Sequence, residues 1–193
     1  MGRRPAACPR DPVHTHVIPS VARDLLLRTN WNQTTMPNKK YWLFKSEPNT
    51  FSIDDLKNRP EQTEPWNGVR NYQARNMLRD DVQLGDLGFF YHSNCTPPGI
   101  VGIFKIVKAG YPDHTACDAK SDFFDPKSTI DNPRWYMVDV KFVKKFARMI
   151  TLDEIKQHAI LKNMQVARQG NRLSITPVTE KEWNTITEIA KLS

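Results

Sequence analysis

Aromatic, amide and basic residues that could bind a nucleobase gather in four short segments of the sequence. These segments are residues 45–46, 66–72, 91–94 and 168–172. Aromatic rings stack on the flat faces of a base that has left its helix, while Asn and Ser side chains hydrogen-bond to its edge. Arginine side chains hold the neighbouring phosphates. The combination predicts a site that accepts a single extruded base of a nucleic acid.

Each of these residues also has a purely structural interpretation. Trp66 could anchor the hydrophobic core, and Asn71 could serve only as the N-cap of the helix that follows it. Arg168 and Arg172 could form a solvated rim. The residue types alone therefore leave nucleic-acid binding as one of several interpretations.

A nucleophilic enzyme is another interpretation, because Cys95 follows His92 by three residues and Asp86 is close in sequence. A thiol is activated when an imidazole lies within hydrogen-bond distance of the sulfur. However, no GxSxG segment or other signature of a cysteine enzyme surrounds this pair. The sequence therefore favours no residue as catalytic.

Metal and cofactor sites find little support in the residue spacing. His92, His114 and His158 are scattered, and no HExxH motif places two histidines on one helix face. The carboxylate pairs at 54–55 and 80–81 suit exposed helix ends. P-loop and dinucleotide-binding fingerprints are absent from the sequence. We therefore predict no metal ion and no cofactor.

The composition suits one globular domain with an anionic partner. The chain has 193 residues, of which 39% are hydrophobic, and 28 Lys and Arg exceed 21 Asp and Glu to give a net charge of +7. This charge is compatible with a phosphate-bearing partner. No apolar run reaches the ~18 residues of a membrane-spanning helix, so no membrane partner is expected. Three widely spaced cysteines favour a reducing compartment.

The first 35 residues differ from the rest of the sequence. They mix Pro, Arg and His without a regular period, and their compact apolar run at 25–27 is too short for a secretory signal. Met36 follows directly, and a strand pattern begins five residues later. We expect residues 1–35 to be a disordered or mis-assigned leader and residues 36–193 to form the domain.

Strands and helices follow one another without a regular βαβ alternation. Hydrophobic periodicity and turn residues predict strands at 40–47, 87–93, 99–108, 134–146 and 172–178. Four short helices are predicted after the N-cap residues Ser52, Asn71, Thr151 and Thr179. This order favours an α+β domain built on a small curled sheet or barrel. The long segment 109–134 is predicted to be a functional loop.

Several long blocks of the sequence resemble the EVE domain family. The blocks are KYWLFKSEPNTFSIDDL, WNGVRNYQARNML, GDLGFFYHSNCTPPGIVGIFKIV, NPRWYMVDVKFV and RQGNRLSITPVTEKEW. They cover essentially all of residues 39–187 in the order of the family, whereas residues 1–35 match nothing in it. Ala167 is a departure, because a larger apolar residue is expected before the Arg-Gln-Gly segment.

The resemblance implies a PUA-like fold, which is a mixed β pseudo-barrel flanked by short helices. It also implies a relationship to YTH domains, which bind methylated adenine in RNA, and a pocket for a modified base, chiefly modified cytosine. By this likeness the base pocket would be lined or bordered by Lys45, Ser46, Trp66, Val69, Asn71, Tyr91, His92, Ser93 and Trp135. The residues expected at the phosphates are Arg70, Arg168, Gln169, Gly170, Asn171 and Arg172.

We therefore expect a non-catalytic module that binds DNA or RNA carrying a methylated or hydroxymethylated base. An RNA- or DNA-processing enzyme of a related PUA-like branch is the alternative. A third interpretation is an adaptor that binds a protein partner through a helix at 179–192. The compartment expected from the resemblance is the cytoplasm in a bacterium and the nucleus in a eukaryote.

Overall fold

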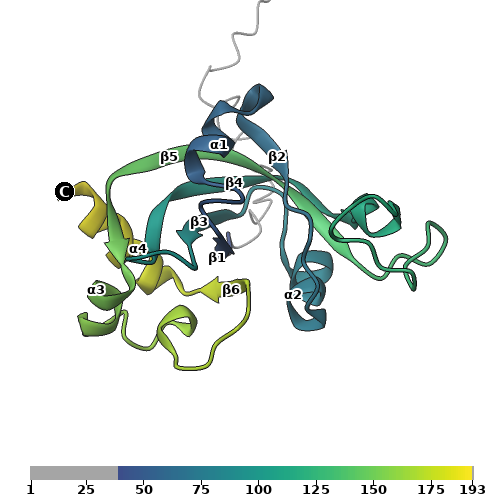
Figure 1. Cartoon of the computed structure of the whole chain (residues 1–193). Coiled ribbons are helices and arrows are strands. Elements are labelled where there is room, and N and C mark those ends of the chain that lie inside the picture. Colours follow the sequence, from purple (N-terminus) through teal and green to yellow (C-terminus); the bar gives the residue numbers. More distant parts are fainter. Residues whose placement is uncertain (1–38, 193) are drawn as a thin grey trace, which may run out of the picture. The chain divides into compact units, whose positions relative to one another are not determined.

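The computed structural model describes residues 39–192, so the predicted leader at 1–35 lies outside the described residues (Figure 1). The strands are β1 (Tyr41–Ser46), β2 (Thr63–Pro65), β3 (Leu87–His92), β4 (Gly99–Pro112), β5 (Tyr136–Thr151) and β6 (Ile175–Val178). The α-helices are α1 (Ile53–Asn58), α2 (Tyr72–Asn76), α3 (Leu152–Gln157) and α4 (Glu180–Lys191). Within residues 39–192, no helix has both the length and the apolar character needed to cross a membrane.

The helix starts follow from local capping signals in the sequence. Ser52, Thr151 and Thr179 each accept a hydrogen bond from the backbone N–H three residues later, and the side chain at that position bonds back, which gives three capping boxes. Asn71 Oδ1 accepts a hydrogen bond from the Ala74 N–H at 3.1 Å and starts α2. All four predicted helix starts are confirmed.

The six strands form one mixed sheet in the order β2-β5-β4-β3-β1-β6. β1 and β3 run parallel, whereas the other neighbouring pairs are antiparallel. The α+β class is confirmed, but the edge strands β2 and β6 do not pair with each other, so the expected pseudo-barrel is an open, curved sheet (Figure 1). The three-residue strand β2 was not predicted, because it is too short to show a period of two.

Hydrophobic side chains cover both faces of the centre of the sheet. Phe44 and Phe90 point to one cluster, which includes residues of α1 and α2. Their neighbours Leu43 and Phe89 point to a second cluster, which includes residues of α3 and α4. The split arises because successive side chains of a strand point to opposite faces. β3, which lies between β4 and β1, therefore contributes to the core on both of its faces.

One end of the sheet collects the ends of five strands. The parallel ladder places Ser46 beside His92, so β1 and β3 end together. Gly99, the first residue of β4, pairs with both His92 and Thr151, the last residue of β5. β6 begins at the same end, because it runs antiparallel to β1. The segments that enter and leave these strands can therefore build one site.

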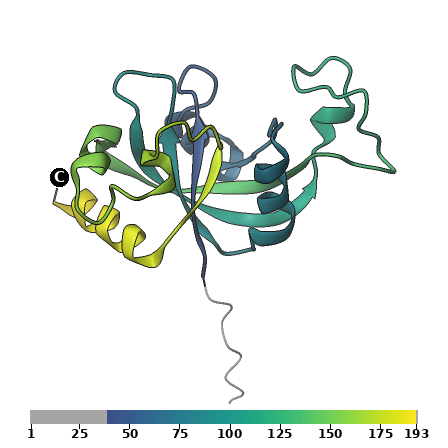
Figure 2. The same ribbon diagram turned by 90° about the horizontal axis from the view of Figure 1, so that it is seen from below.

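β4 and β5 are longer than the sequence predicts, and they carry the loop 113–135. They pair as far as Pro112 and Tyr136, whereas the hydrophobic pattern predicts an end of β4 at 108. Cross-strand hydrogen bonds extend these strands through residues that have no strand-like pattern of their own. The loop 113–135 projects beyond the sheet, away from α3 and α4 (Figure 2).

Candidate nucleic-acid interface

A cavity of ≈ 270 Å³ opens beside the end of β1, and we call it the aromatic cavity. Its aromatic side chains are Phe51 from the turn after β1, Trp66 from the segment after β2, and Phe123 from the loop 113–135. Its other lining residues are Lys45, Ser46, Thr50, Arg59, Glu64, Pro65 and Asn67. Aromatic rings beside amide and hydroxyl groups suit one flat heterocycle with a polar edge.

Trp66 contributes little free surface to the aromatic cavity, because its side chain is only 8% exposed. The ring packs against Phe44 and Phe90 at centroid distances of 5.3 Å and against Phe104 at 6.1 Å. Trp66 is therefore mainly an anchor of the hydrophobic core, which agrees with the structural interpretation of this residue. A base in this cavity has to stack chiefly on another ring.

Phe123 offers that ring, because its side chain is 38% exposed. The Arg70 guanidinium carbon lies 5.6 Å from the centre of the Phe123 ring and 5.4 Å from that of Trp135, both within the range of cation–π attraction. Arg70 Nε also donates to the Phe123 carbonyl at 3.0 Å, and Nη2 donates to the same oxygen. Arg70 therefore holds both the backbone and the side chain of Phe123.

Asp113 ties the loop 113–135 to the segment after β2. Its side chain is fully buried, and the carboxylate accepts hydrogen bonds from the Gly68 N–H at 3.0 Å and from Arg70 Nη1 at 2.8 Å. The Thr115 N–H and hydroxyl donate to it at 2.9 Å and 2.6 Å. Burial raises the pKa of Asp113, but the hydrogen bonds from Thr115, Arg70 and Gly68 outweigh it and lower the pKa below its ordinary value. Asp113 is thus an ionised anchor.

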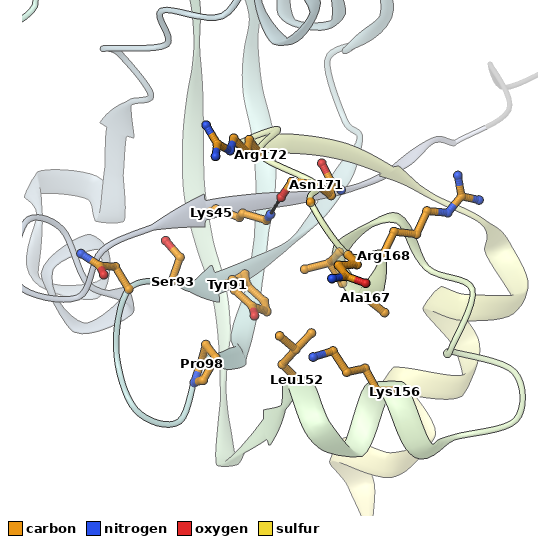
Figure 3. A pocket seen from close by; sticks show the side chains of 14 residues that line it. Lys45, Tyr91, Ser93, Pro98, Leu152, Lys156, Ala167, Arg168, Asn171 and Arg172 are labelled. Carbon is orange, nitrogen blue, oxygen red and sulfur yellow. Dashed lines mark hydrogen bonds between the residues drawn. The ribbon is translucent and has the colours of Figure 1, made fainter.

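A second cavity of ≈ 720 Å³ lies at the same end of the sheet, and we call it the basic cavity (Figure 3). Its cationic lining residues are Lys45, Lys156, Arg168 and Arg172, and among the described residues no Asp or Glu lines it. Its apolar lining residues are Pro98, Leu152, Val166 and Ala167. The remaining lining residues are Tyr91, Ser93, Asn94, Gln169, Gly170 and Asn171.

Lys45 lines both cavities. Its Nζ donates to the Asn171 carbonyl at 3.3 Å, and within residues 39–192 no carboxylate forms an ion pair with it. Burial lowers the pKa of Lys45, because the half-buried ammonium has lost part of its hydration. An anion beside Lys45 would compensate for that loss.

Tyr91 lies between two lysines in the basic cavity. Figure 3 shows Lys45 and Lys156 on opposite sides of Tyr91, whereas the Arg168 side chain extends away from it. Burial raises the pKa of Tyr91 to about 12, so the hydroxyl stays protonated and can donate a hydrogen bond at neutral pH. This part of the cavity thus combines two cations with one neutral donor.

The side-chain amide of Asn171 fixes the conformation of the loop 168–172. Asn171 Nδ2 donates to the Gln165 carbonyl, and Asn171 Oδ1 accepts from the Leu173 N–H at 3.0 Å. Gly170 has a φ of 76°, a left-handed conformation that favours glycine. The Asn171 side chain therefore shapes the loop, while Gln169 and Arg172 remain exposed at the cavity.

Five expected site residues line neither cavity, namely Val69, Arg70, Asn71, His92 and Trp135. Val69 is buried in the core, and the Asn71 side chain caps α2. The Arg70 guanidinium, which was expected at a phosphate, is bound to Asp113 and to the Phe123 carbonyl. Trp135 stacks on Tyr72 at 5.0 Å and therefore supports Arg70 from outside the cavity.

His92 positions α1, and within residues 39–192 no hydrogen bond joins it to Cys95. His92 Nε2 accepts a hydrogen bond from the Ile53 N–H at 3.2 Å, whereas the Cys95 Sγ lies 3.4 Å from the Pro97 carbonyl oxygen. Burial lowers the pKa of His92, so its neutral form accepts this hydrogen bond. In the described part of the chain, no group of three or more His, Cys, Asp and Glu residues is placed to hold a metal ion.

Phe51, Asn67, Phe123 and Lys156 are among the cavity residues that sequence reasoning missed. Asn67 lies in the segment 66–72, and Phe123 lies in the predicted functional loop, so both had a signal nearby. Lys156 had none, because a lysine on a short helix usually faces solvent.

Several known proteins are similar to this chain. The sequence model described as the EVE domain matches residues 40–189. Thymocyte nuclear protein 1 of Gallus gallus is 52% identical over 162 residues, which cover 75% of this chain and 66% of that protein. The Homo sapiens protein of the same name is 49% identical over 161 residues, which cover 75% of this chain and 71% of that protein. The chain thus spans about two thirds of the length of these relatives.

Solved structures share the fold. Human THYN1 in complex with DNA that contains 5-methylcytosine has a TM-score of 0.74 and 46% identity, and the match covers 79% of this chain and 98% of that chain. A Leishmania major protein has a TM-score of 0.76 and 44% identity, with coverage of 80% and 96%. A Pseudomonas syringae protein has a TM-score of 0.74 and 46% identity, with coverage of 78% and 99%.

Proposed function

The chain belongs to the EVE domain family, and we propose that it binds nucleic acid carrying a modified cytosine without altering the base. The observation that carries this proposal is the aromatic cavity of ≈ 270 Å³, which adjoins a basic cavity through Lys45. The complex of the human relative with 5-methylcytosine-containing DNA supports the choice of ligand.

The base enters the aromatic cavity and stacks on the exposed ring of Phe123. Asn67 can bond its edge, because it lines this cavity and its side-chain amide has no hydrogen-bond partner within residues 39–192. A carboxamide can accept from the exocyclic amine of cytosine and donate to the adjacent ring nitrogen. Phe51 supplies apolar surface for a methyl group at C5, and the largely buried Trp66 adds a little more.

The phosphates of the bound strand meet the cations of the basic cavity. Lys45, Arg168 and Arg172 are available there, since no ion pair joins them to a carboxylate in the described residues. Each phosphate contact on a single strand lowers log K by about 0.7 per tenfold rise in salt. Binding should therefore weaken steadily as salt is added.

Recognition of the modification is expected to be moderate. One methyl group in an apolar niche contributes about 1–3 kcal/mol, which corresponds to roughly 10- to 200-fold discrimination. Such discrimination requires only that the niche fits the methyl group, so it needs no catalytic group. The relatives named thymocyte nuclear protein support a nuclear location for a eukaryotic member of this kind.

Fluorescence anisotropy with short single strands tests this function. Matched DNA and RNA strands carry one cytosine, 5-methylcytosine, 5-hydroxymethylcytosine or N6-methyladenine at the same position. We expect a strand with a modified cytosine to bind at least tenfold more tightly than the strand with cytosine. Mass spectrometry of the strand after incubation should show an unchanged mass. Equal affinity for all strands would contradict recognition, and a shifted mass would contradict binding without conversion.

A further inference from the structure

We propose that the basic cavity binds the nucleotide next to the modified base, so that the protein recognises a phosphodiester-linked dinucleotide. This inference rests on the proposed function of the aromatic cavity. It goes further because it assigns the second cavity to a complete nucleoside with its phosphate.

The size of the basic cavity exceeds what a phosphate contact requires. Its volume is ≈ 720 Å³, compared with ≈ 270 Å³ for the aromatic cavity. Sites for whole small molecules occupy about 300–1,000 Å³, whereas phosphates are commonly held by side chains at an open surface. The volume therefore fits a nucleoside together with its phosphate.

The lining of the basic cavity is divided between charged and apolar surface. Lys45 and Lys156 lie on either side of the Tyr91 hydroxyl, while Leu152 and Pro98 form part of an apolar wall (Figure 3). A phosphate alone would engage the lysines and leave the apolar wall in water. A nucleoside attached to that phosphate would cover the wall with its sugar and base.

Lys45 supplies the link between the two cavities. It lines both of them, and it lies at the end of β1 where their linings meet. Consecutive nucleotides of one strand are joined by one phosphodiester, so a base in each cavity would place that group near Lys45. The half-buried Lys45 ammonium has no carboxylate partner among residues 39–192, which favours an anion at this point.

A set of four small ligands tests the inference by competition against a labelled strand. The first ligand is 5-methyldeoxycytidine bisphosphate. The second and third are dinucleotides in which a pyrimidine nucleotide is joined to the 5′ or to the 3′ side of 5-methyldeoxycytidine. The fourth is the tighter-binding of these dinucleotides with an abasic sugar in place of the added pyrimidine nucleoside. All ligands carry phosphates on both ends. We expect one dinucleotide to bind at least fivefold more tightly than the bisphosphate, and the abasic sugar to remove most of this gain.

Lys156→Gln and Lys162→Gln form a matched pair of variants. Lys156 lines the basic cavity, whereas Lys162 is exposed and lines neither cavity. Lys156→Gln should reduce the gain from the second nucleotide at least threefold and lower the salt dependence by about one phosphate contact. Lys162→Gln should change neither quantity.

The outcomes separate this inference from the proposed function. Equal affinity of both dinucleotides and the bisphosphate, with 5-methylcytosine still preferred over cytosine, would overturn the second nucleotide site alone. A gain that survives the abasic substitution would reduce the basic cavity to a phosphate contact and also overturn it. Loss of the preference for 5-methylcytosine over cytosine among the single strands of the anisotropy assay would overturn the proposed function and this inference with it.

Discussion

Phe123 lies directly over the backbone of Gly68, although the two residues belong to different loops. A Cβ atom built on Gly68 would approach three carbons of the Phe123 ring, the nearest at 2.7 Å. Gly68 also has a φ of 75°, which favours glycine. The wall of the aromatic cavity therefore depends on the absence of a side chain at this position.

Gly68→Ala should displace Phe123 and weaken binding of 5-methylcytosine strands. The left-handed backbone costs alanine about 1–2 kcal/mol, and the added methyl group forces the ring to move. Unfolding by urea measures the first effect, and anisotropy measures the second. Gly85→Ala is the control, because Gly85 has a φ of 93° and no atom within 4 Å of an added Cβ. It should lose stability but retain affinity.

Phe123→Ala should reduce the affinity for a 5-methylcytosine strand by about 1–3 kcal/mol, which is the usual effect of losing a stacked aromatic ring. Its neighbour Phe124 offers a matched control, because it is 42% exposed and lines neither cavity. Phe124→Ala should bind as the wild type does. Titration calorimetry of both variants checks this prediction, and equal losses in the two would contradict the role of Phe123. Trp66→Ala is less informative, because removal of a buried Trp also costs about 3–5 kcal/mol of stability.

Asp113→Ala should lower the free energy of unfolding by about 3 kcal/mol and weaken base binding. The substitution leaves the Arg70 guanidinium and the Gly68 N–H without their buried acceptor. Arg70 then no longer anchors Phe123, so the wall of the cavity is lost. Asp131→Ala, at an exposed position of the same loop, should leave both quantities unchanged in denaturation and anisotropy measurements. Full affinity in a folded Asp113→Ala variant would refute the anchoring role.

His92 should make folding stability depend on pH. Burial lowers the pKa of His92 in the folded protein, so the unfolded chain binds a proton more readily. Its contribution to stability is complete above the unfolded pKa of about 6.5 and is lost as the pH falls through the folded pKa. His92→Gln, which can still accept from the Ile53 N–H, should flatten the urea-unfolding profile between pH 8 and 5. His114→Gln, at an exposed position, should keep the wild-type profile.

Local signals in the sequence were sufficient for most elements of the fold. Capping residues such as Ser52 and Thr151 determine helix starts through contacts three residues away, so the sequence pattern reports them directly. The open sheet and the length of β4 and β5 depend instead on pairing between distant strands. Such pairing has no local pattern, which explains why these features differed from expectation.

The candidate site was predicted in part for the same reason. Lys45 and Ser46 end a recognisable strand, and the structure places Lys45 in the lining of both cavities and Ser46 in that of the aromatic cavity. Asn71 was expected to line or border the base pocket, whereas its side chain caps α2 and Asn67 lines the aromatic cavity. The role of Phe123 depends on the tertiary contact with Gly68 and Arg70, which no sequence spacing reveals.

The most direct test of base capture is nuclear magnetic resonance with a strand whose single 5-methylcytosine carries a ¹³C-labelled methyl group. We predict nuclear Overhauser contacts from this methyl group to the rings of Phe51 and Phe123, an upfield shift from the ring currents, and no contact to Phe124. A bound strand whose methyl group keeps its free chemical shift and contacts none of these rings would contradict the account.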